Sequence, residues 1–167
     1  MAFILAIDGR AAAGKTTLAA LFEKRLRAQI IHTDDFFLPP EKRKNRVAGH
    51  MDLEGLEKVL KKLSDGKTAA YKPYDCAAGK YKKEIKISPR GIIIVEGCYC
   101  LHPRLAKYYK QKIFLDISKS VQNKRLLSRG GKQHLKTFQK IWIPDEERYF
   151  RKYSPQKRSN ILLIKNS

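Results

Sequence analysis

The chain has 167 residues, of which 43% are hydrophobic, a length and a composition that suit one folded domain and argue against global disorder. Its 36 basic and 16 acidic residues give a formal net charge of +20, which attracts anions such as nucleic acid, acidic lipid or phosphorylated small molecules without choosing among them. Three cysteines without zinc-ligand spacing favour reduced thiols and a cytoplasmic location, and no apolar run approaches the roughly 18 residues of a membrane span.

Apolar runs alternate with helical patterns along the chain. The first run, residues 3–7, predicts a strand and not a signal peptide, because no basic segment precedes it. Four further runs, several of them apolar throughout, predict strands at 29–32, 92–95, 113–116 and 161–164. Helical spacing or helix-forming residues predict helices at 16–27, 53–63, 103–110, 118–128 and 145–152. This alternation implies a single α/β domain over residues 1–167, with parallel strands joined by right-handed crossovers.

Some segments interrupt this rhythm. Residues 38–52 are rich in proline and charge, which predicts a surface excursion. Residues 72–89 contain the stretch 81–87, in which apolar and charged residues alternate, and this predicts a short hairpin in the segment. Gly130 and Gly131 indicate a hinge in a mobile loop. Trp142, between two isoleucines, is interpreted as a core residue, with a stacking platform as the alternative.

The segment GRAAAGKT, which begins at Gly9, matches the pattern G-x-x-x-x-G-K-[ST] of the phosphate-binding loop, with a strand before it and a helix after it. Small residues let the backbone N–H groups point inward at an anion, and the N-terminal end of the following helix adds positive potential. Lys15 would reach the β- and γ-phosphates, and the Thr16 hydroxyl would ligate Mg²⁺. We expect the nucleotide site to contain Gly9, Arg10, Ala11, Ala12, Ala13, Gly14, Lys15, Thr16 and Thr17.

Carboxylates follow two other predicted strands. Asp34, in HTDDFF, and Glu96, in IIIVEG, fall at the carboxyl edge of the sheet, where ligands bind in open α/β folds. Asp34 could accept a proton from an attacking hydroxyl and help to hold the metal, and Glu96 could bind Mg²⁺ or orient one of its waters. The alternatives are that Asp34 caps a turn and that Glu96 is an exposed strand-end acid.

Two arginines lie four residues apart at the end of a predicted helix. Arg125 and Arg129 share one helix face, and arginines on a closing segment can stabilise a transferring phosphoryl group, although a solvated helix end is the alternative. Weaker signals are Phe37, His50 and Tyr74, which could line a pocket for a sugar or a base, or serve packing and surface roles.

The motifs together resemble the uridine kinase family, part of a group of phosphate-loop kinases that includes pantothenate kinase and phosphoribulokinase. The resemblance runs through GRAAAGKTT, DDFFLPP, YDCAAGKY, IIIVEGCYCLHPRL, KIFLDI, RLLSRGG, WIPDEERYF and SNILLI, which cover nearly the whole chain. The chain departs from the family at Ala11, Ala12 and Ala13, where serines and a glycine are usual, at Gly130, which replaces an acid, and in the short basic segment EKRKNR. These departures concern the acceptor more than the phosphoryl donor.

The resemblance implies a fold, a reaction and roles for particular residues. The fold would be the three-layer α/β/α of P-loop NTPases, with five parallel strands in the nucleoside-monophosphate-kinase order and a lid at about 129–142. The reaction would be ATP- or GTP-dependent phosphorylation of a small-molecule hydroxyl with Mg²⁺. Asp34 would be the catalytic base, Glu96 would stand near the metal, Arg125 and Arg129 would serve the lid, and Tyr74 would stand near the nucleoside.

Three functions remain under consideration. The leading one is a kinase that uses ATP to phosphorylate a small molecule, with the 5′-hydroxyl of a nucleoside such as uridine or cytidine as the first candidate. The second is a kinase for another acceptor, such as pantothenate or a sugar. The third is a nucleotide-regulated module that binds nucleic acid, which the charge favours but which no aromatic-interleaved basic motif supports. The sequence leaves the oligomeric state open.

Overall fold

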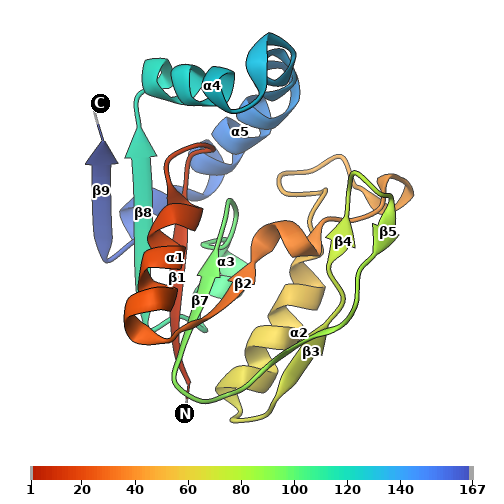
Figure 1. The fold of residues 1–167 in the computed structure, drawn as a ribbon, viewed down its shortest axis with the longest axis vertical. Coiled ribbons are helices and arrows are strands. Elements are labelled where there is room, and N and C mark those ends of the chain that lie inside the picture. The colour runs from red at the N-terminus through yellow and green to blue at the C-terminus, as the bar shows by residue number, and fades with distance from the viewer. Residues whose placement is uncertain (1, 166–167) are drawn as a thin grey trace.

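The computed structural model describes residues 2–165, which fold around one sheet of five parallel strands. The strand order is β2-β7-β1-β8-β9, the order expected for the nucleoside-monophosphate-kinase type, and all four neighbouring pairs are parallel. All five predicted strands are confirmed, with small shifts at their ends (Figure 1). Their bounds are β1 Phe3–Gly9, β2 Gln29–His32, β7 Ile92–Glu96, β8 Gln111–Ile117 and β9 Ile161–Lys165.

Helices cover both faces of this sheet and complete three layers. Their bounds are α1 Lys15–Leu26, α2 Leu53–Ser64, α3 Pro103–Ala106, α4 Lys119–Thr137, α5 Ile143–Tyr153 and α6 Pro155–Arg158. Short 3-10 turns occupy Thr33–Phe36 and Pro40–Lys42. Helix α3 ends earlier than the predicted 103–110, because the chain turns toward β8 and the Lys110 amide donates to the Ile4 carbonyl at 2.8 Å.

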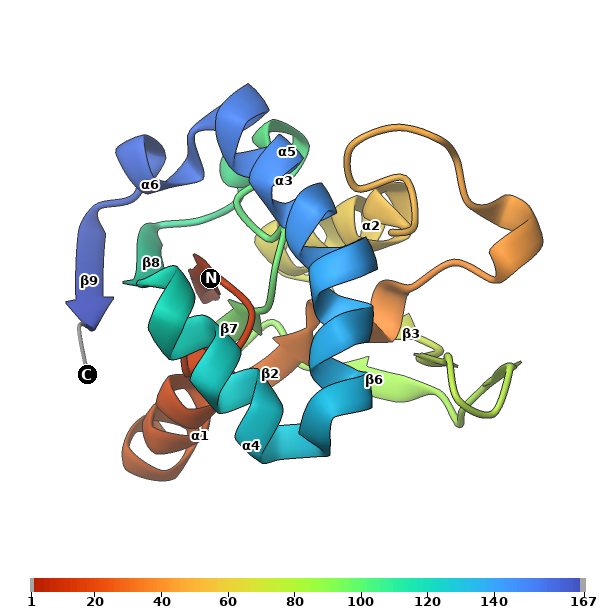
Figure 2. The same cartoon turned by 90° about the horizontal axis from the view of Figure 1, so that it is seen from above.

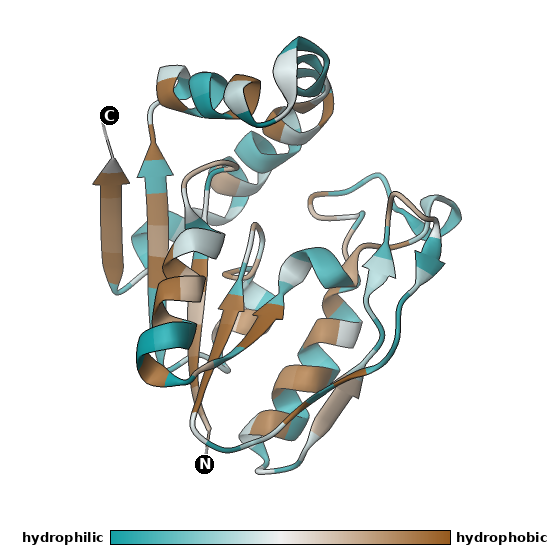
Figure 3. Ribbon diagram, in the orientation of Figure 1, coloured by the Kyte–Doolittle hydropathy of each residue, from teal (hydrophilic) through white to brown (hydrophobic). Residues whose placement is uncertain are grey.

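The core has one part on each face of the sheet. On one face, Leu5, Ile7, Ile94 and Leu115 pack against α1 residues such as Ala19. On the other face, sheet residues including Ile4, Ile93 and Phe114 pack with α2, α3 and α5. The strands are largely hydrophobic, whereas α2 carries hydrophobic and hydrophilic bands, as expected for a helix with one buried face (Figure 3). This packing fixes the carboxyl ends of the strands relative to the helices that follow them.

A short hairpin lies within residues 72–89, as predicted, but the alternating segment 81–87 does not pair with itself. The segment divides between two antiparallel pairs: β5 Lys80–Tyr81 pairs with β4 Tyr74–Asp75, and β6 Ile85–Ile87 pairs with β3 Ala69–Tyr71. Alternating hydrophobicity reports an extended backbone and not the partner strand, so the pattern found the extended segments and missed their pairing.

Helices α4 and α5 form a helical arm above the carboxyl ends of the strands (Figures 1 and 2). Gly130 and Gly131 fall within α4 and not in a loop, which corrects the sequence-based expectation. The helix is kinked at Gly131, which has φ 75° and ψ −172°, a conformation that glycine adopts without steric cost. A π-helical turn, Phe138–Trp142, joins α4 to α5.

Candidate active site

The loop between β1 and α1 has the curled backbone that its sequence predicts. Gly9, Ala12 and Gly14 have positive φ values of 144°, 63° and 99°. A Cβ atom on Gly9 would lie 2.1 Å from the Leu115 carbonyl oxygen, so only glycine lets β1 and β8 approach this closely at the start of the loop. The loop thus passes directly from a buried strand into the N-terminal end of α1, an arrangement suited to an anion.

The Lys15 side chain is folded back on this loop. Its Nζ donates to the carbonyl oxygens of Gly9, at 2.9 Å, and Arg10, at 2.8 Å, and lies 3.5 Å from Cys98 Sγ. Burial works against its positive charge, but the surrounding acidic groups outweigh burial and raise the pKa of Lys15. The ammonium group is therefore charged and lies in the loop, within reach of the cavity that the loop lines.

Glu96 is the centre of a polar cluster at the strand ends. Its Oε1 lies 2.6 Å from His32 Nδ1 and 3.2 Å from Thr16 Oγ1. The hydrogen bond to Glu96 raises the pKa of His32. Asp34 follows β2 and faces the same cavity, and burial raises the pKa of its carboxyl group. Hydroxyl and carboxylate oxygens from three segments thus meet at one edge of the sheet.

This set of oxygen donors fits Mg²⁺. Mg²⁺ is commonly held by one or two protein carboxylates, a hydroxyl, waters and substrate phosphates, and not by a cage made of protein alone. Thr16 and Glu96 are in contact, and both line the cavity beside the phosphate loop. His32 also contacts Glu96 Oε1 and so restricts the orientation of the carboxylate.

A cavity of about 590 Å³ joins the loop to an aromatic wall. The Phe37 and His50 rings stack with centroids 5.2 Å apart, and Trp142 meets both edge-on at 5.8 and 5.3 Å. Tyr99 lies 5.1 Å from His50 on another side. Trp142 is only partly buried and lines the cavity, so its assignment to the core is wrong. The π-helical turn before α5 brings the Trp142 ring to the cavity, which sequence spacing did not predict.

Arg43, from the basic excursion, also faces this cavity. Its Nε donates to the Leu38 carbonyl at 2.9 Å, and its Nη2 lies 3.9 Å from Cys76 Sγ. Among residues 2–165, no carboxylate forms an ion pair with Arg43. The excursion therefore places an unneutralised cation beside the aromatic wall.

The remaining predicted residues are placed as follows. Arg129 lines the cavity, whereas Arg125 Nη1 donates to the Ala12 carbonyl at 3.2 Å and so contacts the phosphate loop itself. Arg10 is not part of the cavity lining; its guanidinium pairs with Asp116 at 2.8 Å and lies 3.7 Å from Glu146 Oε1. Tyr74 packs against Tyr81 and lies outside the cavity lining, so its predicted role has no geometric support.

Helix α5 supplies acidic residues that sequence analysis passed over. Asp145 and Glu146 are buried; Asp145 accepts a hydrogen bond from the Tyr99 hydroxyl at 2.9 Å, and Glu146 accepts one from the Ala11 amide at 2.6 Å. Tyr149, on the same face, donates to Asp8 below the loop at 2.7 Å. The buried face of α5 consists of Asp145, Glu146, Tyr149 and Phe150, which have the spacing of one helix face. This face is not evident as a hydrophobic pattern because two of its four residues are charged.

The fold and the loop define a phosphate-loop nucleotide-binding protein of the α/β class, and comparisons with known proteins refine this class. The sequence model of the Phosphoribulokinase / Uridine kinase family matches residues 4–153. A uridine kinase from Mycoplasma pneumoniae is 34% identical over 127 residues, which cover 68% of this chain and 60% of that protein. A uridine kinase from Clostridium botulinum is 32% identical over 151 residues, which cover 83% and 73%. The chain belongs to the phosphoribulokinase/uridine kinase family.

Solved structures support the fold. One from Bacillus stearothermophilus, described as a possible uridine kinase, has a TM-score of 0.73 at 19% identity, covering 96% of this chain and 88% of that one. Phosphoribulokinase from Rhodobacter spheroides has a TM-score of 0.70 at 12% identity, covering 98% and 70%. The chain spans less than two thirds of the Mycoplasma protein and 30% of two Arabidopsis uridine kinase-like proteins. Among residues 2–165, no helix has the length and hydropathy needed to cross a bilayer.

Proposed function

We propose that the chain transfers the γ-phosphoryl group of ATP to the hydroxyl of a small molecule, with the 5′-hydroxyl of a nucleoside such as uridine or cytidine as the first candidate. One observation carries the proposal: the phosphate loop, Asp34, Glu96 and the aromatic wall line a single cavity. A donor bound by the loop and an acceptor bound at the wall would meet beside Asp34. Family membership supports the phosphotransfer.

The proposed mechanism assigns a task to each group. Asp34 accepts the proton of the acceptor hydroxyl as its oxygen bonds to the γ-phosphorus, and the bond from that phosphorus to the β–γ bridging oxygen breaks, releasing ADP. Lys15 turns from the loop carbonyls to the β- and γ-phosphates. Thr16 and Glu96 would hold Mg²⁺, which would offset the charge of the phosphates when bound.

Two arginines are assigned to stabilising the transition state, and one segment is assigned to the lid. Arg129 faces the cavity and would offset charge on the transferring group, and Arg125 would act from its place on the loop. In the single domain that we propose for residues 1–167, residues 129–142 form the lid, with the kink at Gly131 as its pivot. We further propose a cytoplasmic location, where ATP is available and thiols stay reduced.

The nucleoside is favoured by the aromatic wall and by the names of the relatives. Phe37 and Trp142 offer ring surfaces that suit a planar base, and relatives at 32–34% identity are named uridine kinases. Arg43 favours a second candidate, because a guanidinium that lines the cavity without a carboxylate partner among residues 2–165 suits an acceptor that carries a carboxylate or a phosphate. Pantothenate, which has a carboxylate, represents this class.

A panel of acceptors tests the proposal. The purified chain is incubated with MgATP and, separately, with uridine, cytidine, a sugar and pantothenate, and the release of ADP is measured. We expect one acceptor class to stimulate ADP release strongly, and Asp34→Asn to abolish this stimulation while ATP binding persists. Normal transfer by Asp34→Asn would rule out Asp34 as the base. Absence of ATP binding by the unmodified chain would rule out the kinase.

A further inference from the structure

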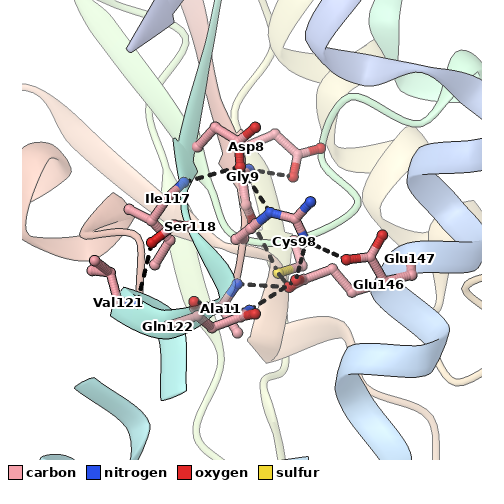
Figure 4. Close-up of polar contacts among 12 residues, drawn as sticks. Asp8, Gly9, Ala11, Cys98, Ile117, Ser118, Val121, Gln122, Glu146 and Glu147 are labelled. Atoms are coloured by element: carbon pink, nitrogen blue, oxygen red, sulfur yellow. Dashed lines mark hydrogen bonds and ion pairs between the residues drawn. The ribbon is translucent and has the colours of Figure 1, made fainter. Parts of the chain in front are cut away.

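The Glu146 carboxylate accepts a hydrogen bond from a backbone amide of the phosphate loop. Its Oε2 accepts the Ala11 N–H at 2.6 Å, and its Oε1 accepts from Gln122 Nε2 at 3.0 Å (Figure 4). The Glu146 side chain is only 2% exposed, yet it belongs to the lining of the cavity beside the loop. A negatively charged group therefore already sits where the loop presents a donor to anions.

Neighbouring distances place this carboxylate at the end of the loop that serves the terminal phosphate. Glu146 Oε2 lies 3.5 Å from Cys98 Sγ (Figure 4). The same sulfur lies 3.5 Å from Lys15 Nζ. In phosphate loops the lysine reaches the β- and γ-phosphates, so we assign a group beside its ammonium to that end of the site. Glu146 thus lies on the γ-phosphate side of the site.

We propose that Glu146 is a specificity-determining residue of the donor site, which competes with the γ-phosphate for the Ala11 amide. This inference rests on the proposed function, since it requires a triphosphate in the loop. A diphosphate leaves the Ala11–Glu146 hydrogen bond in place. A triphosphate must displace the carboxylate or bind beside its negative charge. The hydrogen bond therefore weakens the binding of ATP relative to that of ADP, and it favours dissociation of ATP when no acceptor is bound.

The helix that carries Glu146 need not move for this exchange. Tyr149, one turn further along α5, donates to the buried Asp8 at 2.7 Å and ties the helix to the end of β1. A turn of the Glu146 side chain alone would free the Ala11 amide. Gln122, which also donates to the Ala11 carbonyl at 3.3 Å, would keep the loop attached to α4 during the exchange.

Binding measurements with both nucleotides test this role. Calorimetry gives Kd values for MgATP and MgADP, without acceptor, for the unmodified chain, Glu146→Gln and Glu146→Ala. We expect the ratio of the MgATP Kd to the MgADP Kd to fall about tenfold in both variants, because one charge-assisted hydrogen bond no longer competes with the γ-phosphate. Glu57→Gln is the control, because Glu57 on α2 pairs with Arg104 and Lys107 and lies outside the cavity lining, and its ratio should stay unchanged.

Each outcome has a definite meaning. If the ratio of the two Kd values is unchanged in the Glu146 variants, or if both nucleotides weaken together, Glu146 only supports the loop and the inference is overturned. Glu146→Gln preserves the size of the side chain, so it keeps the test available if Glu146→Ala fails to fold. If the unmodified chain binds neither nucleotide, the proposed function itself fails, which is distinct from an unchanged ratio.

Discussion

His32 Nδ1 lies 2.6 Å from Glu96 Oε1, so the carboxyl ends of β2 and β7 are joined by a hydrogen bond between side chains. The imidazole restricts the orientation of a carboxylate that also contacts Thr16 Oγ1 at 3.2 Å. The metal affinity of the proposed Mg²⁺ site should therefore depend on a residue that need not touch the metal.

The first prediction concerns His32→Gln. We expect the Mg²⁺ concentration that gives half-maximal ADP release to rise about tenfold, because Glu96 loses its orienting partner. His102→Gln is the control, since His102 accepts a hydrogen bond from the Arg104 amide at the start of α3 and lies outside the cavity lining. An unchanged Mg²⁺ requirement in His32→Gln would show that His32 does not position Glu96 for the metal.

The second prediction concerns the aromatic wall. Trp142→Ala removes the ring that meets Phe37 and His50, and we expect the KM of the acceptor to rise about tenfold while the Kd of MgATP changes less than about twofold. Trp142→Phe should restore part of the loss. Steady-state kinetics with the acceptor found by the panel provide the measurement. Equal losses in acceptor and ATP binding would show that Trp142 stabilises the fold and does not bind the acceptor.

The third prediction uses the acidity of Asp34. Burial raises the pKa of this carboxyl group, and the base must be deprotonated to accept a proton. As the pH falls, kcat/KM for the acceptor should therefore decline at a pH above the ordinary aspartate range near 4. A pH–rate profile at saturating MgATP measures this limb. A decline that begins only near pH 4 would contradict the assignment of a buried Asp34 as the base.

The fourth prediction links Tyr149 to stability. Burial raises the pKa of Asp8 to about 6, above its ordinary value of 3.8, so folding favours the protonated carboxyl and stability falls as the pH rises through 6. The Tyr149 hydroxyl donates to the charged form and opposes this fall. Tyr149→Phe should therefore lower the free energy of unfolding by about 1.5–3 kcal/mol at pH 8 and by less at pH 5.

Chemical denaturation at the two pH values measures this difference. Tyr153→Phe is the matched control, because the Tyr153 hydroxyl forms no hydrogen bond with a residue in the range 2–165, and its loss should be small at both pH values. Equal destabilisation of Tyr149→Phe at pH 5 and pH 8 would mean that the hydroxyl does not stabilise a charged Asp8.

Much of this fold could be predicted from local pattern. The five strands could be found because a parallel strand covered on both faces is a nearly continuous apolar run, as in IIIV before Glu96. The phosphate loop could be found because its chemistry depends on residues that are adjacent in the chain. Its strand, glycines, lysine and threonine all fall between Phe3 and Thr16, and the structure confirms their arrangement.

The features that escaped prediction depend on contacts across the chain. Glu146 meets Ala11 across 135 positions, and nothing in PDEERYF distinguishes a buried acid from a solvated one. Trp142 lies between isoleucines, as a core residue would, but a π-helical turn brings it to the cavity. Tyr74 was a weak pocket signal that the resemblance reinforced, but its ring packs against Tyr81 across the small antiparallel pair β4–β5.

A crystal structure of the chain grown with MgATP tests the central claim most directly, that the bend after β1 binds a triphosphate. We predict β-phosphate oxygens within hydrogen-bond distance of the amides of Gly14, Lys15 and Thr16, with Lys15 Nζ turned from the carbonyls of Gly9 and Arg10 to the phosphates. Nucleotide bound elsewhere, with Lys15 Nζ still on those two carbonyls, would contradict the account.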